Sequence, residues 1–316
     1  MKFIFKKMKQ INLYKKVFGL VKQIPEGSIT TYKAIAIALG DEIAARAVGG
    51  ILHTNKKIDE ITCYRVVNSD STVGGYVLGT KEKIRRLDRD GIKIKDDEIQ
   101  DFEKILFSDF KTDYPLKKLR QEQSKLKNRI KLEKLLVTDN LTVAGIDVSY
   151  QGQKAKGVYV LLDKNFEILE QKTIICKINF PYIPTYLSYR ELSVILKLMR
   201  LVKNKPDILM IDGNGILHPL RMGIATHAGI LLNTRTIGVA KSLLSTNRRT
   251  FGASYDLKIE NNFIKDGNEI IGFVLGKNYI SPGHKTDLGT SIEIVKLFMK
   301  NKQPEPIRLA HNLSRF

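Results

Sequence analysis

The sequence predicts an α/β protein in which a small helix-turn-helix domain precedes a larger domain of alternating strands and helices. Two short helical segments lie close together in the first part of the chain, and strand-length apolar runs alternate with a helical segment after residue 140. An acidic stretch at residues 96–113 separates these two patterns. The 316 residues are enough to bury the cores of two domains.

The helix-turn-helix is predicted from two neighbouring segments. In "TTYKAIAIALG", Thr30 and Thr31 are N-cap candidates and Gly40 is a C-terminal stop. The segment "EIAARAVGGIL" follows within a few residues. Two short helices joined by a tight turn are typical of helix-turn-helix and winged-helix-like domains.

The second half begins with "YPLKKLRQEQSKLKNRIKLEKLL", which has the pattern of a basic amphipathic helix. Strands are predicted for "TVAGIDVSY", "KGVYVLLD", "ILEQKTIICKI" and "DILMIDG", with the helix "YRELSVILKLMRLV" before the last of them. A helix between strands indicates α/β layers. We therefore expect a first domain over 1–98, a linker over 99–113 and a second domain over 114–316.

The net charge of +20 is unevenly distributed. Residues 1–113 carry 21 lysines and arginines against 16 acidic residues, whereas residues 114–316 carry 32 against 17. Such an excess favours a polyanionic partner, because each neutralised phosphate releases a condensed counterion. Charge alone does not separate DNA from RNA or from a membrane surface.

The chain has two cysteines, Cys63 and Cys176, without the spacing of metal ligands. This argues against a disulfide framework and against zinc, and it indicates a reducing cytoplasm. The apolar runs are too short to cross a membrane. Cys176 lies in a predicted strand and is expected to be a small buried hydrophobe. Cys63, in "EITCYRVVNSD", is either a core thiol or a nucleophile.

Two predicted strands each lead to an aspartate, Asp147 in "VAGIDVSY" and Asp212 in "DILMIDGNG". Strand ends of α/β sheets are common ligand sites. Glu191 opens a helix after "FPYIPTYLSYRE", so three carboxylates converge if the two strands are neighbours. A cluster of like charges needs a cation, which predicts Mg²⁺ or Mn²⁺ and hydrolysis of a phosphodiester. Either strand-end aspartate taken alone is better explained as a loop cap.

The second half resembles endonuclease V from about residue 114 to the C-terminus. The blocks that carry the resemblance follow one another along the chain: "VAGIDVSY", "FPYIPTYLSYRE", "IDGNGILHPLRMGIATHAG", "TIGVAK", "SPGHKTDLGTSIE" and "PEPIRLAH". The resemblance implies an RNase H-like fold and nicking of DNA at deaminated purines, chiefly deoxyinosine. Cleavage at the second phosphodiester 3′ to the lesion would leave 3′-hydroxyl and 5′-phosphate ends.

The same resemblance implies residue roles. Asp147, Glu191 and Asp212 would bind the metal directly or through water, and His284 in "SPGHK" would complete the site. The residues expected at the DNA are His218 and Lys241 by the scissile phosphate, Tyr182 in "PYIP" as the wedge that opens the stack, and Gly213 and Gly223 around the base. Thr185 stands where the family usually has glycine, which bears on the shape of the base pocket.

The first half resembles the C-terminal domain of alkylguanine-DNA alkyltransferases over about residues 11–95, through "ARAVGGILHTN" and "TCYRVVNSDSTVGGY". The resemblance implies irreversible transfer of an alkyl group from a guanine oxygen to Cys63. It assigns Tyr32 to rotating the nucleotide and Arg46 to filling the vacated stack from a recognition helix with small residues. The remaining expected residues are Arg65, which follows the acceptor, and Asn55 and Tyr76, which support the active-site turn and the base.

Two departures from this family concern proton transfer. Tyr64 stands in place of the histidine that relays the thiol proton, and Asp90 stands in place of the usual glutamate. Because a thiolate is the nucleophile, Cys63 needs another means of activation. Tyr64 acting through water, the N–H groups of the turn and the neighbouring Arg65 are the candidates.

Three hypotheses follow. The first is a monomeric, Mg²⁺-dependent, two-domain DNA repair enzyme with both chemistries. The second makes the N-terminal domain a lesion sensor that binds alkylguanine without accepting its alkyl group. The third is a related nuclease directed at RNA, or a transposase-like enzyme, although the "PYIP" and "SPGH" blocks argue against a transposase.

Overall fold

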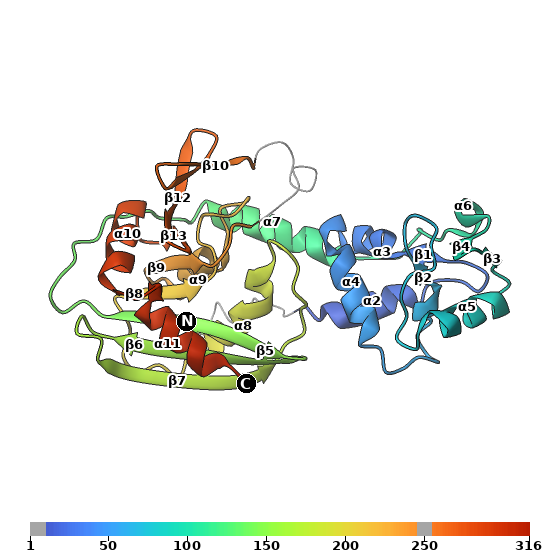
Figure 1. Cartoon of the computed structure of the whole chain (residues 1–316), viewed down its shortest axis with the longest axis horizontal. Coiled ribbons are helices and arrows are strands. Elements are labelled where there is room, and N and C mark those ends of the chain that lie inside the picture. Colours follow the sequence, from blue (N-terminus) through green and yellow to red (C-terminus); the bar gives the residue numbers. More distant parts are fainter. Residues whose placement is uncertain (1–10, 245–254) are drawn as a thin grey trace. The chain divides into compact units, whose positions relative to one another are not determined.

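The computed structural model describes residues 11–244 and 255–316. They form two compact units (Figure 1). The N-terminal unit comprises Ile11–Gln121 together with Asn179–Ile183. The C-terminal unit includes Glu122–Ile178 and the described part of Pro184–Phe316. Within the described ranges, every helix is too short or too polar to cross a bilayer.

The N-terminal unit is mainly helical. Its elements are α2 (Leu13–Val21), β1 (Thr30–Thr31), α3 (Tyr32–Leu39), the 3-10 helix η1 (Glu42–Ala44), α4 (Ala45–His53), the 3-10 helix η2 (Cys63–Arg65), β2 (Val66–Val67), α5 (Thr80–Arg89), β3 (Ile94–Lys95), β4 (Glu98–Ile99) and α6 (Phe102–Ile105). Helix α7 (Pro115–Lys127) begins in this unit.

The helix-turn-helix prediction is confirmed in α3 and α4. The Thr31 hydroxyl accepts the Ala34 N–H at 2.9 Å and so caps α3. Gly40 ends the helix in a left-handed conformation with φ +103°. A Cβ at this glycine would lie 2.7 Å from the backbone nitrogen of Lys117, so the turn needs glycine for two reasons.

Residues 99–113, where the sequence predicted a linker, pack within the N-terminal unit. Ile99 is buried, and the Phe107 N–H donates to the Ile29 carbonyl at 2.7 Å. The Thr112 hydroxyl donates to the Ala38 carbonyl at 2.6 Å. Apolar and hydrogen-bonded contacts thus hold this acidic stretch against the helices and strands of the unit.

The C-terminal unit is built on a nine-stranded sheet. Its elements are β5 (Val143–Gln151), β6 (Lys154–Leu162), β7 (Ile168–Lys177), α8 (Leu187–Met199), β8 (Ile208–Asp212), α9 (Ile224–Leu232), β9 (Thr236–Ala240), β10 (Leu257–Glu260), β11 (Phe263–Asp266), β12 (Glu269–Leu275), β13 (Asn278–His284), α10 (Leu288–Leu297), β14 (Met299–Lys300), β15 (Gln303–Pro304) and α11 (Glu305–Ser314). The order across the sheet is β10-β11-β12-β13-β9-β8-β5-β6-β7, in which β5, β8 and β9 are parallel.

Helices cover both faces of this sheet, which confirms the predicted α/β layers. One face packs against α10 and α11 in a core that includes Val143, Met210 and Phe298. The other packs against α8 and α9 in a core that includes Ile146 and Leu192. Successive residues of a strand point to opposite faces, and this alternation sets the side from which each polar residue of β5 and β8 projects.

The basic helix predicted from residue 114 is shorter than its pattern suggests. Helix α7 ends at Lys127, and the chain then runs without helical structure to residue 140. Tertiary contacts replace the helical bonds: the Leu135 N–H donates to the Thr290 hydroxyl at 3.1 Å, and Leu135 and Val137 pack against the core beneath α10. Packing here overrides local propensity.

Candidate active sites

The carboxylates of the C-terminal unit come from adjacent strands. Strands β9, β8 and β5 lie side by side, and Asp212 is the last residue of β8. Asp147 follows Ile146, the last β5 residue that pairs with β8. Asp147 has the parity of Val143, and Asp212 has the parity of Met210, so both project on the α11 face. The predicted convergence of two strand aspartates is therefore present.

Helix α11 completes this cluster with His311. Ligand atoms of Asp147, Asp212 and His311 all lie within 4.8 Å of one another. His311 Nδ1 is 3.3 Å from Asp147 Oδ2, and the Ser314 hydroxyl donates to the same oxygen at 2.5 Å. The two carboxylates offer the oxygen donors that suit Mg²⁺ or Mn²⁺, and the imidazole adds a nitrogen donor beside them.

Lys241 follows β9 and pairs with the second aspartate. Its Nζ lies 2.7 Å from Asp212 Oδ2 and 3.4 Å from His311 Nδ1. Burial raises the pKa of Asp212 to about 6, and the Asp147 charge acts in the same direction, although Lys241 opposes both. The two carboxylates repel each other at this distance, and a bound cation would offset that repulsion.

Glu191 reaches the same end of the sheet from α8. It is buried, and burial raises its pKa to about 8 even though the Tyr150 hydroxyl donates to its Oε1. The Asp147 and Asp212 charges raise that pKa further, which places Glu191 in their electrostatic neighbourhood. The Arg190 guanidinium stacks 3.9 Å from the centre of the Tyr150 ring and so holds the phenol that contacts Glu191.

His218 is buried in the loop between β8 and α9. Its Nδ1 accepts the Leu220 N–H at 3.1 Å, and its Nε2 lies 3.1 Å from the Thr185 carbonyl. These partners define a neutral ring with the proton on Nε2. Thr185 has φ +68°, a conformation that favours glycine, which explains why glycine suits this position.

The two glycines expected around a base are tightly packed. Gly213 has φ +144°, and a Cβ there would lie 2.6 Å from the Ile224 side chain. A Cβ on Gly223 would lie 2.2 Å from the Asn214 carbonyl oxygen. Close backbone approach thus accounts for both glycines within the unit, whether or not they also face a ligand.

His284 lies apart from the Asp147–Asp212–His311 cluster among the described residues. Its Nδ1 accepts the Lys131 backbone N–H at 3.3 Å, and the His284 backbone N–H donates to the Thr236 hydroxyl at 2.9 Å. Burial lowers its pKa to about 4, helped by Lys285 and the cations of the 129–131 segment. His284 therefore holds the basic 129–131 segment at the end of β13. The histidine beside the two aspartates is His311, where the sequence predicted His284.

Tyr182 is an exposed aromatic between buried neighbours. Its side chain is 54% exposed, whereas Phe180 is 3% exposed and Ile183 is fully buried. The Leu13 N–H donates to the Asn179 carbonyl at 3.0 Å and anchors the start of this segment. A ring held outward by anchored neighbours is suited to act as a wedge.

Cys63 lies on η2 of the N-terminal unit with its thiol nearly covered, 4% exposed. Asn55 donates to Cys63 Sγ at 3.1 Å and to the Ile61 carbonyl at 3.2 Å, so it holds the turn that carries Cys63. Burial raises the pKa of the thiol to about 11, although the Asn55 hydrogen bond and the Lys83 charge oppose this shift. The resting cysteine is therefore a protonated thiol.

Tyr64 and Arg65 both turn to Asp90. The Tyr64 hydroxyl donates to Asp90 Oδ1 at 3.3 Å, and Arg65 Nε donates to Oδ2 at 2.5 Å. Arg65 also donates to the Ile24 carbonyl at 3.0 Å. Tyr64 and Asp90 thus form the hydrogen bond that a proton relay would need. The phenol proton is directed at the carboxylate, however, and Arg65 neutralises the charge of that carboxylate.

The other expected lesion-binding residues occupy different elements. Tyr32 opens α3, and its hydroxyl donates to the Gly75 carbonyl at 3.2 Å. The buried Tyr76 hydroxyl has no hydrogen-bond partner among the described residues, and its ring meets Tyr64 edge-on at 6.5 Å. An unpartnered buried hydroxyl is free to bind an incoming group. Arg46 is exposed on α4, as an intercalating residue needs to be.

Replacing Arg65 with leucine is expected to lower the free energy of unfolding by about 3 kcal/mol, because it leaves the buried Asp90 charge unpaired. The Arg65 and Asp90 side chains are only 10% and 9% exposed. Urea unfolding followed by circular dichroism measures this loss. The matched variant Arg46→Leu should unfold like the unmodified protein and weaken only binding to DNA. Equal stability of the two variants would contradict a structural role for Arg65.

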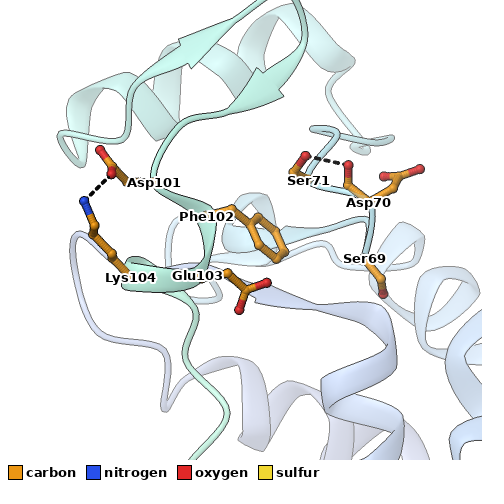
Figure 2. A pocket seen from close by; sticks show the side chains of 7 residues that line it. All are labelled: Ser69, Asp70, Ser71, Asp101, Phe102, Glu103 and Lys104. Carbon is orange, nitrogen blue, oxygen red and sulfur yellow. Dashed lines mark hydrogen bonds and ion pairs between the residues drawn. The ribbon is translucent and has the colours of Figure 1, made fainter.

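A surface hollow elsewhere on the N-terminal unit contains none of the expected site residues (Figure 2). Its lining residues are Ser69, Asp70, Ser71, Asp101, Phe102, Glu103 and Lys104. Lys104 is paired with Asp101 at 2.6 Å, which leaves two further carboxylates in the lining. This balance of charge disfavours a nucleic-acid backbone, so the hollow is not part of either candidate site.

Sequence reasoning missed several residues of these sites. His311 ends the "PEPIRLAH" block, and Ser314 lies three residues after it. This block was the feature of the sequence that could have identified both residues. Tyr150 closes the "VAGIDVSY" block that supplied Asp147. Lys83 lies in a segment rich in charged residues and gives no signal in the sequence. Cys176 also differs from expectation: it is half-buried because β7 is an edge strand.

Comparison with known families agrees with this division. The Endonuclease V family profile matches residues 124–312, and the profile of the 6-O-methylguanine DNA methyltransferase DNA-binding domain matches residues 12–92. A bifunctional methyltransferase/endonuclease of Picrophilus torridus is 39% identical, with 96% of each chain covered. A protein of the same name from Thermoplasma volcanium is also 39% identical, over 95% of this chain and 88% of that one.

Solved structures give the same result for the fold. Endonuclease V of Ciona intestinalis, crystallised with a 24mer DNA containing an inosine followed by a ribo-adenosine, has a TM-score of 0.56 and 30% identity. The match covers 64% of this chain and 97% of the Ciona chain. The RNase H-like fold predicted for the second half is therefore confirmed.

Proposed function

Because this chain belongs to the family of bifunctional methyltransferase/endonucleases, we propose that it repairs DNA by two separate chemistries. The C-terminal unit nicks DNA on the 3′ side of deoxyinosine and leaves 3′-hydroxyl and 5′-phosphate ends. The N-terminal unit transfers an alkyl group from guanine O6 to Cys63, and the transfer consumes the protein.

The convergence of Asp147, Asp212 and His311 carries the nuclease proposal. Carboxylates that share a buried site, one of them with a raised pKa, fit a divalent cation, and their oxygen donors suit Mg²⁺ or Mn²⁺. When bound, such an ion supplies Lewis-acid stabilisation of the scissile phosphate and an activated water. These three residues would hold it.

The remaining polar residues of the site have roles of their own. The Ser314 hydroxyl and Lys241 orient the oxygens of Asp147 and Asp212. Lys241 also supplies positive charge to an anionic phosphate. His218 has a defined neutral tautomer with an Nε2 proton, so it can donate to a phosphate oxygen that displaces the Thr185 carbonyl. The exposed ring of Tyr182, a residue of the N-terminal unit, would separate the DNA strands as the lesion base leaves the stack.

The contact between Asn55 and Cys63 carries the transferase proposal. Asn55 holds the sulfur in place, Tyr76 offers an unpartnered hydroxyl, and Tyr32 anchors α3 to the loop at Gly75. Two observations favour the lesion sensor as a second candidate: the Tyr64 hydroxyl is bonded to Asp90, and the thiol is protonated at rest.

Two incubations test these proposals. Duplex DNA with one deoxyinosine should be nicked in Mg²⁺ and stay intact in chelator, and a matched inosine RNA shows whether RNA is preferred. DNA whose O6-methylguanine carries a radiolabelled methyl should leave the label on the protein. Tight binding of the methylated DNA without label transfer would establish the sensor instead.

His311→Ala is expected to raise the metal concentration needed for half-maximal nicking by about 10²-fold, because it removes one ligand and the group beside Asp147. Nicking is measured across a Mg²⁺ titration, and His53→Ala, at the end of α4, is the control for loss of a histidine. An unchanged metal requirement would remove His311 from the site and leave the two aspartates to be tested separately.

A further inference from the structure

Lys83 is a fully buried lysine on a helix made mostly of charged residues. Helix α5 reads "TKEKIRRLDR", and Lys83 and Leu87 are its buried residues. Lys83 has 0% of its surface exposed. Its Nζ donates to the Val66 carbonyl at 2.6 Å and to the Gly75 carbonyl at 3.1 Å. Buried lysines are rare unless something in the site requires them.

The position of Lys83 links it to the cysteine. The Val66 N–H donates to the Cys63 carbonyl at the end of η2, while the Val66 carbonyl binds the lysine. One residue therefore ties the nucleophile's turn to the amine. Gly75 accepts from both Lys83 and the Tyr32 hydroxyl, and the Tyr32 ring lies 5.9 Å from the ammonium.

Lys83 and Cys63 interact with each other and with other titratable groups. Lys83 interacts electrostatically with Cys63 and Asp97, and Cys63 also interacts with the phenols of Tyr32 and Tyr76. Burial lowers the pKa of Lys83 to about 7, so a substantial fraction is neutral amine near neutral pH. Such an amine can accept a proton.

We propose that Lys83 takes the thiol proton of Cys63, in place of the histidine whose position Tyr64 occupies. This inference rests on the proposed alkyl transfer. Tyr64 and Arg65 are both engaged with Asp90, so neither is directed at the sulfur as a base. Lys83 binds the carbonyl of the residue that follows the η2 turn, and its charge acts on the Cys63 thiol, so it is our candidate for that task.

The step balances without a further reactant. The S–H proton passes to the Lys83 amine, and the thiolate attacks the alkyl carbon. The new S–C bond forms as the C–O6 bond breaks, and the guanine ring system takes the electron pair. The proton held by Lys83 then returns to the guanine anion, which leaves an S-alkylcysteine, a neutral lysine and normal guanine. Lys83 thus acts as the general base for the thiol and then as the general acid for the guanine anion.

Lys83→Met tests the proposal in the full chain. Transfer from O6-methylguanine DNA should slow by about 10²-fold or more at neutral pH, the usual contribution of general acid–base catalysis. The rise of its rate with pH should move to more alkaline values. Lys81→Met makes the same change at an exposed position of α5 and should keep the unmodified rate and pH profile. Lys83→Arg keeps a cation that cannot accept a proton, so it should also be slow.

A rescue separates chemistry from folding. Adding Tyr64→His to Lys83→Met should restore part of the rate, because an imidazole beside Asp90 can take the proton. Wild-type rates in Lys83→Met or in Lys83→Arg would overturn the proposal. The thiolate absorbance of Cys63, taken as the difference from Cys63→Ala, needs no transfer. Its titration should move to higher pH in Lys83→Met, and an unchanged titration would also overturn the proposal. If the unmodified protein acquires no label, the transferase assignment fails independently of this titration.

Discussion

Asp147→Asn should eliminate nicking of inosine-containing DNA by more than about 10²-fold, since altering even an outer partner of a metal ligand costs up to that much. The amide keeps the shape of the side chain and its hydrogen bond from Ser314, but it withdraws the charge that a cation needs. Asp212→Asn should have the same effect and should also release Lys241 from its ion pair. Gel-resolved nicking of an end-labelled duplex gives both rates.

The control for this result is Asp139→Asn, which makes the same change at a fully exposed carboxylate of the same unit. It should nick at the unmodified rate. All three variants should retain alkyl transfer, because Cys63 lies in the other unit. Nicking that survives both site variants would show that the phosphodiester is cleaved elsewhere in the chain.

Cys63→Ala should abolish capture of the methyl label completely, since no other group takes the place of the sulfur that forms the bond. Binding to methylated DNA should persist, because the residues expected at the DNA, Arg46 and Tyr32, are untouched. Nicking at inosine should be unchanged. Label is counted on denatured protein after incubation with the radiolabelled duplex.

Cys176→Ala is the matched control, because this cysteine is half-buried on the edge strand β7 of the other unit. It should accept the change without loss of label. Label that remains on the Cys63→Ala protein would assign the transfer to another nucleophile, and peptide mapping of that protein would locate it.

The sequence predicted those features that depend on residues close together in the chain. Thr31 and Gly40 bound α3 because a hydroxyl cap and a left-handed glycine act within one turn of chain. Asp147 and Asp212 were found because each ends a run of apolar strand residues, and the pleat then fixes the face on which each side chain projects.

Residues that depend on distant packing were not predicted. His311 reaches the aspartates because α11 crosses the sheet over Gly145, where a Cβ would lie 2.1 Å from the Pro306 carbonyl oxygen. His284 follows a register shift in β13 and bonds to residue 131 instead. Lys83 resembles its exposed neighbours in sequence, and only the carbonyls of Val66 and Gly75 distinguish it.

The covered, protonated state of the Cys63 thiol has a consequence for the lifetime of the protein. Oxidants and stray electrophiles react with thiolates, and they need access to the sulfur. A thiol that is 4% exposed and has a pKa near 11 offers neither. Under the proposed transfer each molecule accepts one alkyl group, so an earlier reaction at Cys63 would inactivate it without repair. We therefore expect Cys63 to resist peroxide in the absence of damaged DNA, so that the thiol remains available for the one transfer proposed for each molecule.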